Sequence, residues 1–498
     1  MEPRSGMVPV IVWPLAGPSD INHLLPRTRI ICTKGPGADI WIFTPDMSSL
    51  SELLRKYNQP APRYTSYPPV PDWETATFTD GVWKNALVQF RNSEEGNAPA
   101  QVYIHLPYCE SLCTFCACNK RITKNHELED PYITAVLKEW DMYSNLYGGP
   151  IPISEIHLGG GTPTFFSEES LSRLINGILA HAVKTPDFEM GIEVHPGTTT
   201  IQMVRHLHTL GFSRISMGIQ DFSPFILEKI NRTQSFKQTL ELVNEARKCG
   251  YHSINFDLVY GLPFQKISHI EYTVSKVIQL NPDRIAFYGY AHVPWKSKGQ
   301  RHFTEADLPE PVARWALFEK GKEMLAMAGY LSIGMDHFAK PGDALSDAFQ
   351  DGTLHRNFMG YTEQNARLLI GLGASAIGET PDAYAQNEPV IEDYLARIEA
   401  GEFPIFKGHL LSETDKIWKQ HIMELMCHQK TDMDLNDPNW LTALKRVAEM
   451  RDEGLISLKN MTLHITYLGL PFMRTICYML DYRHWESSPE TSAFSAAV

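Results

Sequence analysis

The sequence predicts an α/β fold in which six strand–helix units form an open parallel sheet, followed by a small, mostly helical C-terminal domain. Short apolar runs alternate with amphipathic segments from about residue 100, the alternation stops near residue 400, and two amphipathic segments follow. Strands that alternate with helices indicate parallel pairing through right-handed crossovers. Six units are too few for a closed eight-stranded barrel, so we expect an open barrel or a doubly wound sheet.

The elements follow from apolar runs for the strands and from apolar spacing for the helices. The expected strands are residues 102–106, 153–158, 188–194, 214–218, 253–260 and 284–290. The expected helices between them are residues 132–147, 168–182, 198–211, 235–250 and 267–280. Beyond residue 400, residues 413–427 and 440–453 are expected to be helical and residues 455–463 to hold short strands, as in a winged-helix domain.

Composition excludes several classes of protein. The 498 residues are 43% apolar and 21% charged, which is enough apolar surface for a large core, and the net charge is −13. An acidic chain is a poor candidate for non-specific nucleic-acid binding, so an acidic ligand would need a local basic cluster. No apolar run approaches the roughly 18 residues of a membrane span, and no signal peptide is recognisable. With only eight cysteines, we expect a soluble protein of a reducing compartment, the cytoplasm.

Chemistry gathers where the expected strands end. A cysteine cluster follows the first strand, a Gly159–Pro163 turn follows the second, and the third carries Glu193. The later strands add Gln220-Asp221, Asp257 and Tyr290-Ala291-His292. Because ligands in parallel sheets bind beyond the carboxyl ends of the strands, this order predicts one shared site.

The cysteine cluster is the strongest motif in the chain. Half of the cysteines lie within ten residues, at Cys109, Cys113, Cys116 and Cys118. A structural zinc site remains the alternative, but it usually takes two ligand pairs from separated segments, and no second pair is present. A tight loop of three thiolates suits three irons of a [4Fe–4S] cluster and leaves the fourth iron open.

The C-x3-C-x2-C spacing, the preceding strand and the aromatic Phe115 before the third cysteine resemble the radical S-adenosylmethionine (radical SAM) enzymes. This resemblance implies that Cys109, Cys113 and Cys116 hold a [4Fe–4S] cluster whose open iron is chelated by S-adenosylmethionine. It also implies that the Gly159–Pro163 turn contacts the amino group of that cofactor. By itself the turn is a weak signal, because a plain tight turn needs the same residues.

Longer stretches resemble one family of these enzymes, the oxygen-independent coproporphyrinogen III oxidases. The resemblance covers nearly everything from about residue 50 to residue 485, and it includes the additional Cys118, which is not a cluster ligand in the family. It implies an open partial TIM-like (β/α)6 barrel with an N-terminal segment and the helical C-terminal domain. The stretches that carry it are residues 56–58, 62–68, 103–107, 216–222, 257–263, 334–339 and 355–358.

The same resemblance implies the domain limits. Residues 96–330 form the catalytic barrel, residues 47–95 a segment that covers the active site, residues 331–400 a connecting segment that contributes to the pocket, and residues 401–498 the C-terminal domain. Residues 1–46, rich in proline and without a sustained period, are expected to be a poorly ordered extension. This extension is either an upstream start that the cell does not use or an ordinary arm of the chain.

The implied reaction is anaerobic oxidative decarboxylation of coproporphyrinogen III to protoporphyrinogen IX in haem biosynthesis, by a 5′-deoxyadenosyl radical made from S-adenosylmethionine. Two S-adenosylmethionine molecules, a reductant protein such as flavodoxin or ferredoxin, and a monomeric enzyme are also implied. Cys118 and Tyr103 are the expected catalytic residues. The residues expected to bind the cofactor are Tyr103, Phe115, Gly160, Gly161, Thr162, Glu193, Gln220, Arg232, Asp257, Ala291 and Ile377.

Four carboxylates on the implied substrate call for basic residues, and Arg63, Lys340 and Arg356 are the candidates. Two departures from the family pattern stand out. Ala117 replaces a glycine in the cysteine loop, and Asn365 stands where the family often has an aspartate, which affects polar contacts near Ile377. The alternatives are a radical SAM enzyme that modifies haem and a haem chaperone of the same fold. Cys118 and residues 62–68 favour the oxidase.

Overall fold

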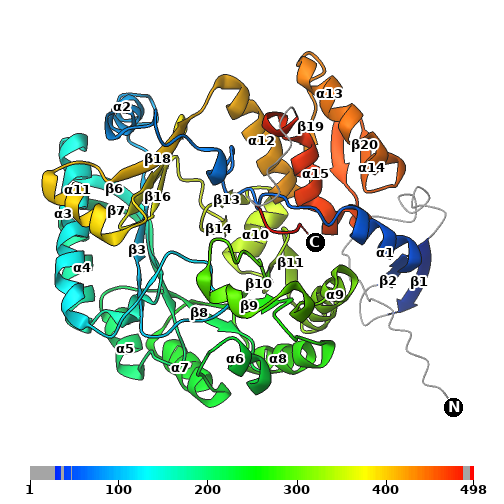
Figure 1. Cartoon of the computed structure of the whole chain (residues 1–498), viewed down its shortest axis with the longest axis horizontal. Helices are drawn as coiled ribbons and strands as arrows, with labels where there is room; N and C mark the ends of the chain where they lie inside the picture. Colours follow the sequence, from blue (N-terminus) through cyan, green and yellow to red (C-terminus); the bar gives the residue numbers. More distant parts are fainter. Residues whose placement is uncertain (1–27, 35–38, 46, 486–493, 498) are drawn as a thin grey trace.

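The computed structural model describes residues 28–34, 39–45, 47–485 and 494–497. A single twelve-stranded sheet dominates it, in the order β11-β12-β10-β9-β8-β7-β6-β3-β15-β16-β17-β18. Six neighbouring strands, β3, β6, β7, β8, β9 and β10, are parallel. They curve around the centre of the barrel, with helices on their outer side (Figure 1). The predicted fold class, an open partial barrel with a helical C-terminal region, is confirmed.

Each of the six expected units is present, with limits close to those predicted. The strands are β3 (Ala100–Leu106), β6 (Ile151–Gly160), β7 (Ala182–Val194), β8 (Arg214–Gln220), β9 (Ser253–Tyr260) and β10 (Arg284–Gly289). The helices on the outer side are α3 (Glu129–Tyr147), α4 (Glu168–Ala180), α5 (Ile201–Thr209), α6 (Pro224–Lys229), α7 (Phe236–Cys249), α8 (Ile267–Leu280) and α9 (Pro311–Met327).

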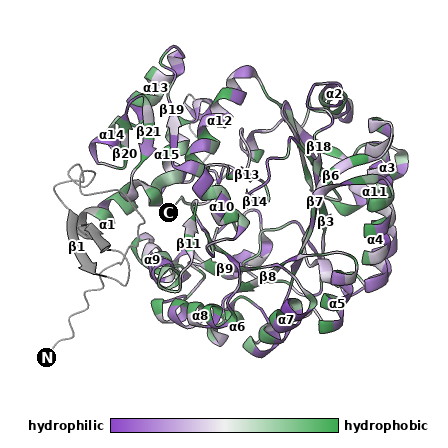
Figure 2. Cartoon of the chain, turned by 180° about the vertical axis from the view of Figure 1, so that it is seen from behind, coloured by the Kyte–Doolittle hydropathy of each residue, from purple (hydrophilic) through white to green (hydrophobic). Residues whose placement is uncertain are grey.

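The outer helices bury one face each. In α4 the buried side chains are Leu171, Leu174, Ile175 and Ile178, a spacing of three and four residues that forms one stripe. Hydrophilic and hydrophobic residues accordingly mix along these helices (Figure 2). The strands beneath are apolar because parallel strands are covered on both faces, and all seven residues of β3 are buried.

Residues 331–410 extend the sheet at both edges, which the sequence patterns did not show. One edge gains β12 and β11, paired antiparallel beyond β10. The other gains β15, parallel to β3, and then three antiparallel strands. The strands are β11 (Leu331–Ile333), β12 (His337–Ala339), β15 (Leu368–Leu372), β16 (Ile377–Thr380), β17 (Ala383–Asn387) and β18 (Ile405–Leu410). Between them lie α10 (Ala344–Asp351), the β13–β14 hairpin (His355–Asn357, Gly360–Thr362) and α11 (Ile391–Ala400).

The segment N-terminal to the barrel contacts helix α9 and, further along, the β16–β18 edge of the sheet. α1 (Met47–Lys56) lies beside α9, η2 (Val70–Asp72) follows, and α2 (Asp80–Arg91) packs on the β16–β18 edge (Figure 1). Within the predicted extension 1–46, residues 28–34 and 39–45 form an antiparallel pair, β1 (Thr28–Lys34) and β2 (Asp39–Pro45), which the analysis of period did not anticipate. The predicted disorder of residues 1–27, 35–38 and 46 lies outside the described residues.

The C-terminal region has four helices and a small antiparallel sheet. Its elements are α12 (Glu413–His428), β19 (Lys430–Asp432), α13 (Pro438–Arg446), α14 (Ala448–Asp452), β20 (Ile456–Lys459), β21 (Thr462–Ile465), η7 (Tyr467–Phe472), α15 (Met473–Leu480) and η8 (Tyr482–His484). Leu50 and Leu54 of α1, and Tyr57 just after this helix, pack into the core of the C-terminal region. No described helix combines the length and the apolar character that crossing a membrane requires.

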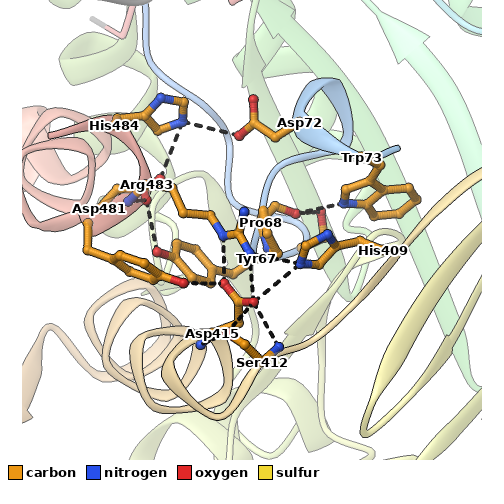
Figure 3. A network of polar contacts seen from close by, with 12 residues as sticks. Tyr67, Pro68, Asp72, Trp73, His409, Ser412, Asp415, Asp481, Arg483 and His484 are labelled. Carbon is orange, nitrogen blue, oxygen red and sulfur yellow. Dashed lines mark hydrogen bonds and ion pairs between the residues drawn. The ribbon is translucent and has the colours of Figure 1, made fainter. Parts of the chain in front are cut away.

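A buried polar network joins this region to the N-terminal segment (Figure 3). Asp415 on α12 is fully buried and accepts hydrogen bonds from Tyr482 (2.6 Å), Arg483 (2.6 and 2.7 Å) and Ser412 (2.7 Å). His409 lies 3.3 Å from the same carboxylate and 3.0 Å from Glu74 of the N-terminal segment. The network therefore fixes three parts of the chain that lie far apart in sequence.

Candidate functional site

The predicted site residues gather around one cavity of about 440 Å³ at the carboxyl ends of the parallel strands. The alternation of β8 shows how: Ile215, Met217 and Ile219 are buried under the helices, whereas the residues between them face the barrel interior. Twelve of the predicted residues line the cavity, namely Cys109, Cys113, Phe115, Cys116, Cys118, Gly160, Gly161, Thr162, Glu193, Gln220, Arg232 and Asp257.

The cysteine loop leaves the end of β3 through a short strand pair, β4 (Tyr108–Cys109) with β5 (Arg121–Ile122). Its sulfurs come to the cavity from different depths, since Cys109 is buried, Cys113 and Cys116 are half-buried, and Cys118 is exposed toward the cavity that it lines. Burial raises the pKa of the Cys109 thiol to about 11. All cysteine side chains that the structure describes are free of disulfides.

The structure brings the predicted ligands to one place. Cys109, Cys113 and Cys116 all line the same cavity. Three thiolates can bind three irons of a [4Fe–4S] cluster and leave the fourth iron open. Among the described residues, no group of three or more His, Cys, Asp or Glu side chains is gathered closely enough to hold one metal ion.

Contacts that the sequence did not reveal hold the cysteine loop in place. Gln300 is fully buried, and its amide nitrogen donates to the carbonyls of Phe115 (2.7 Å) and Ala291 (3.1 Å). Its oxygen accepts from the amide of Val293 (2.5 Å). Ser297 donates to the carbonyl of Cys116 (2.8 Å). These side chains belong to a loop after β10 that has no motif of its own, so no local signal could have identified them.

The glycine run after β6 is required by close packing against the cysteine strand. Gly160 has φ +112°, and a Cβ there would lie 2.7 Å from the ring of His105. A Cβ on Gly161 would lie 2.7 Å from the backbone of Pro107. The next residue, Thr162, reaches the thiol of Cys109 at 3.4 Å. The run therefore brings bare backbone to the edge of the cavity, as contact with a ligand requires.

Glu193, near the end of β7, is an ionised carboxylate inside the cavity. Burial alone would raise its pKa, but His157 at 3.6 Å and the amide of Gly160 at 3.3 Å outweigh it, so the pKa lies below its usual value. His157 stacks on Tyr103, with ring centroids 6.1 Å apart. His157 was missed because it lies within a strand that reads as core.

Asp257 on β9 behaves in the opposite way. Burial, reinforced by the nearby Glu193 carboxylate, raises the pKa of Asp257 to about 6, although Ser216 (2.8 Å) and Asn255 (3.0 Å) donate hydrogen bonds to it. The cavity thus holds two carboxylates whose environments separate their pKa values. Such a pair can accept hydrogen bonds from hydroxyl or ammonium groups of a ligand, while Asp257 keeps its proton to a higher pH than Glu193 does.

Arg232 lies at the cavity, next to the cysteines. Its side chain is directed inward, with the residue only 9% exposed, and one guanidinium nitrogen is 3.5 Å from the sulfur of Cys113. The other two nitrogens bind the carbonyl of Gly218 and the side chain of Gln234 (3.1 Å). Glu228, four residues before Arg232, pairs with Lys229 at 3.4 Å.

Three predicted cofactor residues are not among the cavity-lining side chains. Tyr103 lies behind the wall, where its hydroxyl is 3.2 Å from His105. Ala291 is tied to the cysteine loop through Gln300. Ile377 on β16 packs beside the buried Trp73 and Tyr384, and Asn365 lines a separate cavity near the C-terminal region.

The three basic candidates are dispersed. Arg63 donates to the carbonyl of Gly289 (2.7 Å) and lines a second cavity. Arg356 stacks over Tyr361 at 4.5 Å and donates to the carbonyl of Arg63 (3.3 Å). Lys340 lies at the opposite end of the strands, 3.6 Å from Asp283. The structure does not bring the three candidates together in the cavity of the cysteines.

Comparison with known proteins defines the class. Residues 103–277 match the model of the radical SAM superfamily, and a [4Fe–4S] cluster and S-adenosylmethionine are characteristic of that superfamily. Residues 103–277 therefore form a radical SAM domain, as the cysteine loop and barrel indicated.

Whole-chain relatives define the particular family. The chain is 36% identical over 442 residues to the oxygen-independent coproporphyrinogen III oxidase of Pseudomonas aeruginosa, covering 86% of this chain and 95% of the relative. It is 35% identical over 437 residues to the same enzyme of Escherichia coli strain K12, covering 86% and 94%. The solved structure of the Escherichia coli enzyme, described as a radical SAM enzyme, matches with a TM-score of 0.80 and 32% identity over 87% of this chain and 98% of that one. The chain belongs to the oxygen-independent coproporphyrinogen III oxidase family.

The Gln300 contacts lead to a prediction about the cysteine loop. Gln300→Leu leaves one backbone amide and two carbonyls without a partner, and each unsatisfied buried group costs about 1–3 kcal/mol. We expect the loop to open more readily, so hydrogen exchange of the backbone at residues 113–117 should accelerate at least tenfold. Gln279→Leu, the same substitution at an exposed position that accepts a hydrogen bond from Lys276, is the control. Equal exchange rates in the two variants would contradict the assigned role.

Proposed function

We propose that this chain catalyses the anaerobic oxidative decarboxylation of coproporphyrinogen III to protoporphyrinogen IX. The observation that carries the proposal is the cavity itself: three cysteines, a glycine run and two carboxylates meet at the carboxyl ends of the parallel strands. Membership of the oxygen-independent coproporphyrinogen III oxidase family supports the substrate.

In this proposal Cys109, Cys113 and Cys116 hold the [4Fe–4S] cluster. When bound, the cluster and S-adenosylmethionine together supply the 5′-deoxyadenosyl radical that removes a hydrogen atom from a propionate side chain. The bare backbone of Gly160 and Gly161 accommodates the amino acid end of S-adenosylmethionine, and the ionised Glu193 accepts hydrogen bonds from it. The chain itself thus binds and orients the reactants and excludes water.

Further assignments complete the cofactor site. Phe115, Thr162, Gln220 and Asp257 contact the first S-adenosylmethionine from the cavity wall. A second S-adenosylmethionine, one for each decarboxylation, would reach Ala291 and Ile377 only if it lay beyond the cavity described above. Cys118 and Tyr103 are the proposed catalytic residues. Cys118 supports this role because it is exposed in the cavity beside Cys116 without belonging to the three-cysteine spacing.

The partners follow from the chemistry. The cluster needs an electron from a reductant protein such as flavodoxin or ferredoxin, and free cysteines suit a reducing cytoplasm. We propose a monomeric enzyme with no nucleic-acid partner, in agreement with a net charge of −13.

Arg232→Lys tests the cofactor site without removing a cysteine. A guanidinium can bind Gly218, Gln234 and a ligand carboxylate at once, whereas an ammonium group is a point donor at the end of a flexible chain. Losing a charge-assisted hydrogen bond costs about 1.5–3 kcal/mol, or on the order of ten- to a hundredfold in affinity. Calorimetric titration of the anaerobic variant with S-adenosylmethionine measures this loss.

Arg205→Lys is the matched control, because Arg205 lies on the surface of α5 and pairs only with Glu245 at 2.6 Å. Its affinity should equal that of the unmodified chain. If Arg232→Lys also bound S-adenosylmethionine normally, Arg232 would be a packing residue of the cysteine loop.

The turnover experiment decides the proposed function. Reconstituted protein is incubated anaerobically with a reductant, S-adenosylmethionine and coproporphyrinogen III, and the porphyrins are separated by chromatography. Loss of two carboxylates per substrate, with formation of 5′-deoxyadenosine, is the expected result. Conversion of haem in place of coproporphyrinogen would identify a haem-modifying enzyme, and haem binding without any turnover would identify a chaperone.

A further inference from the structure

A second cavity, of about 410 Å³, lies where the barrel meets the C-terminal region. Its apolar wall comes from Trp315 and Phe318 on α9, Phe349 on α10, and Leu470 and Pro471 on η7. The volume is within the range of cavities that hold small organic ligands. None of the residues predicted to bind the cluster or S-adenosylmethionine lines it.

The charges on this cavity are strongly unbalanced. Four cationic side chains line it, Arg63, Lys322, Arg314 and Arg474, against one carboxylate, Asp336. Asp336 is 3.8 Å from Arg63, but it accepts a hydrogen bond from the ring of His337 at 2.8 Å. Clustered guanidinium groups with too few carboxylates are a common arrangement for binding an anion.

Arg314 is a buried cation of this cavity whose hydrogen bonds within the described chain are incomplete. Its Nε is buried and has no hydrogen-bond partner among the described residues, while one terminal nitrogen donates to the carbonyl of Tyr290 (2.8 Å). Gly289 leaves room for the guanidinium, since a Cβ there would lie 2.8 Å from it. Buried polar groups are normally satisfied, so the guanidinium of Arg314 retains hydrogen-bonding capacity at the edge of the cavity.

Arg474 adds a second buried cation. It is 5% exposed, and its recorded acceptors in the described part of the chain are the backbone carbonyls of Ala61, Pro62 (3.1 Å), Ser495, Ala496 (2.9 Å) and Ala497. Burial, followed by repulsion from Arg63 and Arg314, lowers its pKa well below the usual value. No carboxylate is recorded as an ion-pair partner of Arg314 or Arg474 within the described part of the chain.

The second cavity shares a wall with the cavity of the cysteines. Tyr288 lines the cysteine cavity, and the next residue, Gly289, lines the second one. Likewise, His337 at the start of β12 lines the cysteine cavity, and the preceding residue, Asp336, lines the second one. Neighbouring residues in these two places therefore line different cavities.

We propose that the second cavity binds the carboxylate-bearing edge of a tetrapyrrole, with Arg63, Arg314 and Arg474 facing its propionate groups and the aromatic wall facing its apolar part. This inference rests on the proposed function, which supplies the tetrapyrrole. The ligand chemistry, an apolar body with carboxylates, is shared by the substrate, with four carboxylates, and by the product, with two.

The test measures porphyrin binding by fluorescence on the reconstituted anaerobic protein. Coproporphyrin III stands for the substrate, protoporphyrin IX for the product, and coproporphyrin tetramethyl ester lacks free carboxylates. Arg314→Gln should weaken coproporphyrin III binding ten- to a hundredfold and leave S-adenosylmethionine binding unchanged, and the ester should bind weakly to both proteins. An equal loss for protoporphyrin IX assigns the cavity to the product as well as the substrate, whereas a loss confined to coproporphyrin III assigns it to the substrate.

A second variant guards against misfolding. Ser332→Glu keeps every arginine and adds a competing carboxylate at an exposed position of the same cavity, so it should also weaken binding. Arg205→Gln is the control and should bind like the unmodified chain. Unchanged affinity in both Arg314→Gln and Ser332→Glu, in a protein that still converts coproporphyrinogen III, would overturn the inference alone. Absence of turnover in the unmodified protein would overturn the proposed function, whatever the porphyrin titrations show.

Discussion

Cys113→Ala is expected to abolish the iron–sulfur absorbance of the anaerobically purified protein. Cys113 stands between Cys109 and Cys116 in the spacing, lines the same cavity, and is contacted by Arg232 at 3.5 Å. Alanine offers no ligand to the third iron, and no other described cysteine except Cys118 lines the cavity. Iron and sulfide analysis with visible absorbance measures the result.

Cys118→Ser is the comparison that gives this result its meaning. We expect it to retain the cluster and to lose turnover, because Cys118 lies beside the three proposed ligands without being one of them. A full cluster in Cys113→Ala would show that Cys113 is not a cluster ligand. Iron loss in Cys118→Ser equal to that in Cys113→Ala would instead make Cys118 a ligand.

Asp415→Asn is expected to destabilise the protein by about 3–5 kcal/mol, because it removes the fully buried charge on which an ion pair and several hydrogen bonds converge. Asp415 accepts hydrogen bonds from Arg483, Tyr482 and Ser412 and also caps the first turn of α12. An amide cannot accept from all of these donors at once. The urea midpoint of unfolding measures the loss.

The pH dependence of this loss follows from two groups. Burial would raise the pKa of Asp415, but His409, Arg483 and Tyr482 outweigh it and hold the pKa well below its usual range. A lowered carboxylate pKa stabilises the fold above the unfolded value, about 3.9, and this stabilisation fades as the pH falls below it. Burial opposes protonation of His409, but Asp415 and Glu74 raise its pKa, so its contribution is present below about pH 6.5 and fades as the pH rises. The difference between the unmodified protein and Asp415→Asn should therefore be largest between about pH 4 and pH 6.5.

Glu413→Gln is the matched control, two residues away in the same helical turn. Its carboxylate is 86% exposed and pairs with Lys416 at 2.8 Å. Exposed pairs contribute roughly 0–1 kcal/mol. A comparable loss in both variants would mean that the effect comes from the first turn of α12 and not from the buried network.

The six β/α units could be predicted because each carries its own signal. Buried parallel strands are continuous apolar runs, and the helices between them repeat apolar residues at the helical spacing. β9 and α8, for example, have the limits that the sequence indicated. The strand order then follows from right-handed crossovers between neighbours in sequence.

The sheet extension could not be predicted in the same way. β11 and β12 are three residues long and β16 four, which is too short for a period to appear. β15 pairs with β3 although most of the barrel sequence lies between them. A local pattern cannot predict such a contact. The C-terminal domain was expected to begin at residue 401. The large sheet continues beyond that point, through β18 at Ile405–Leu410.

The residues of the site also fall into those with a local sequence signal and those without one. Cys109, Cys113, Cys116 and the glycine run were identified because their spacing is local. Gln300 and Arg314 act through positions that only the folded chain brings together. The basic candidates failed as a group for the same reason, since only Arg63 lines the cavity where cations gather.

The pairing of β3 with β15 has a consequence for the making of the enzyme. β3 leads directly into the cysteine loop, and one of its edges pairs with β6 while the other pairs with β15. Residues 368–372 leave the ribosome long after residues 100–106, so this edge of β3 stays open, with unpaired backbone groups, through most of synthesis. A fragment that ended before Leu368 would keep that edge exposed and prone to aggregate. The strand that leads into the cysteine loop is therefore paired on both edges only after residues 368–372 have been synthesised.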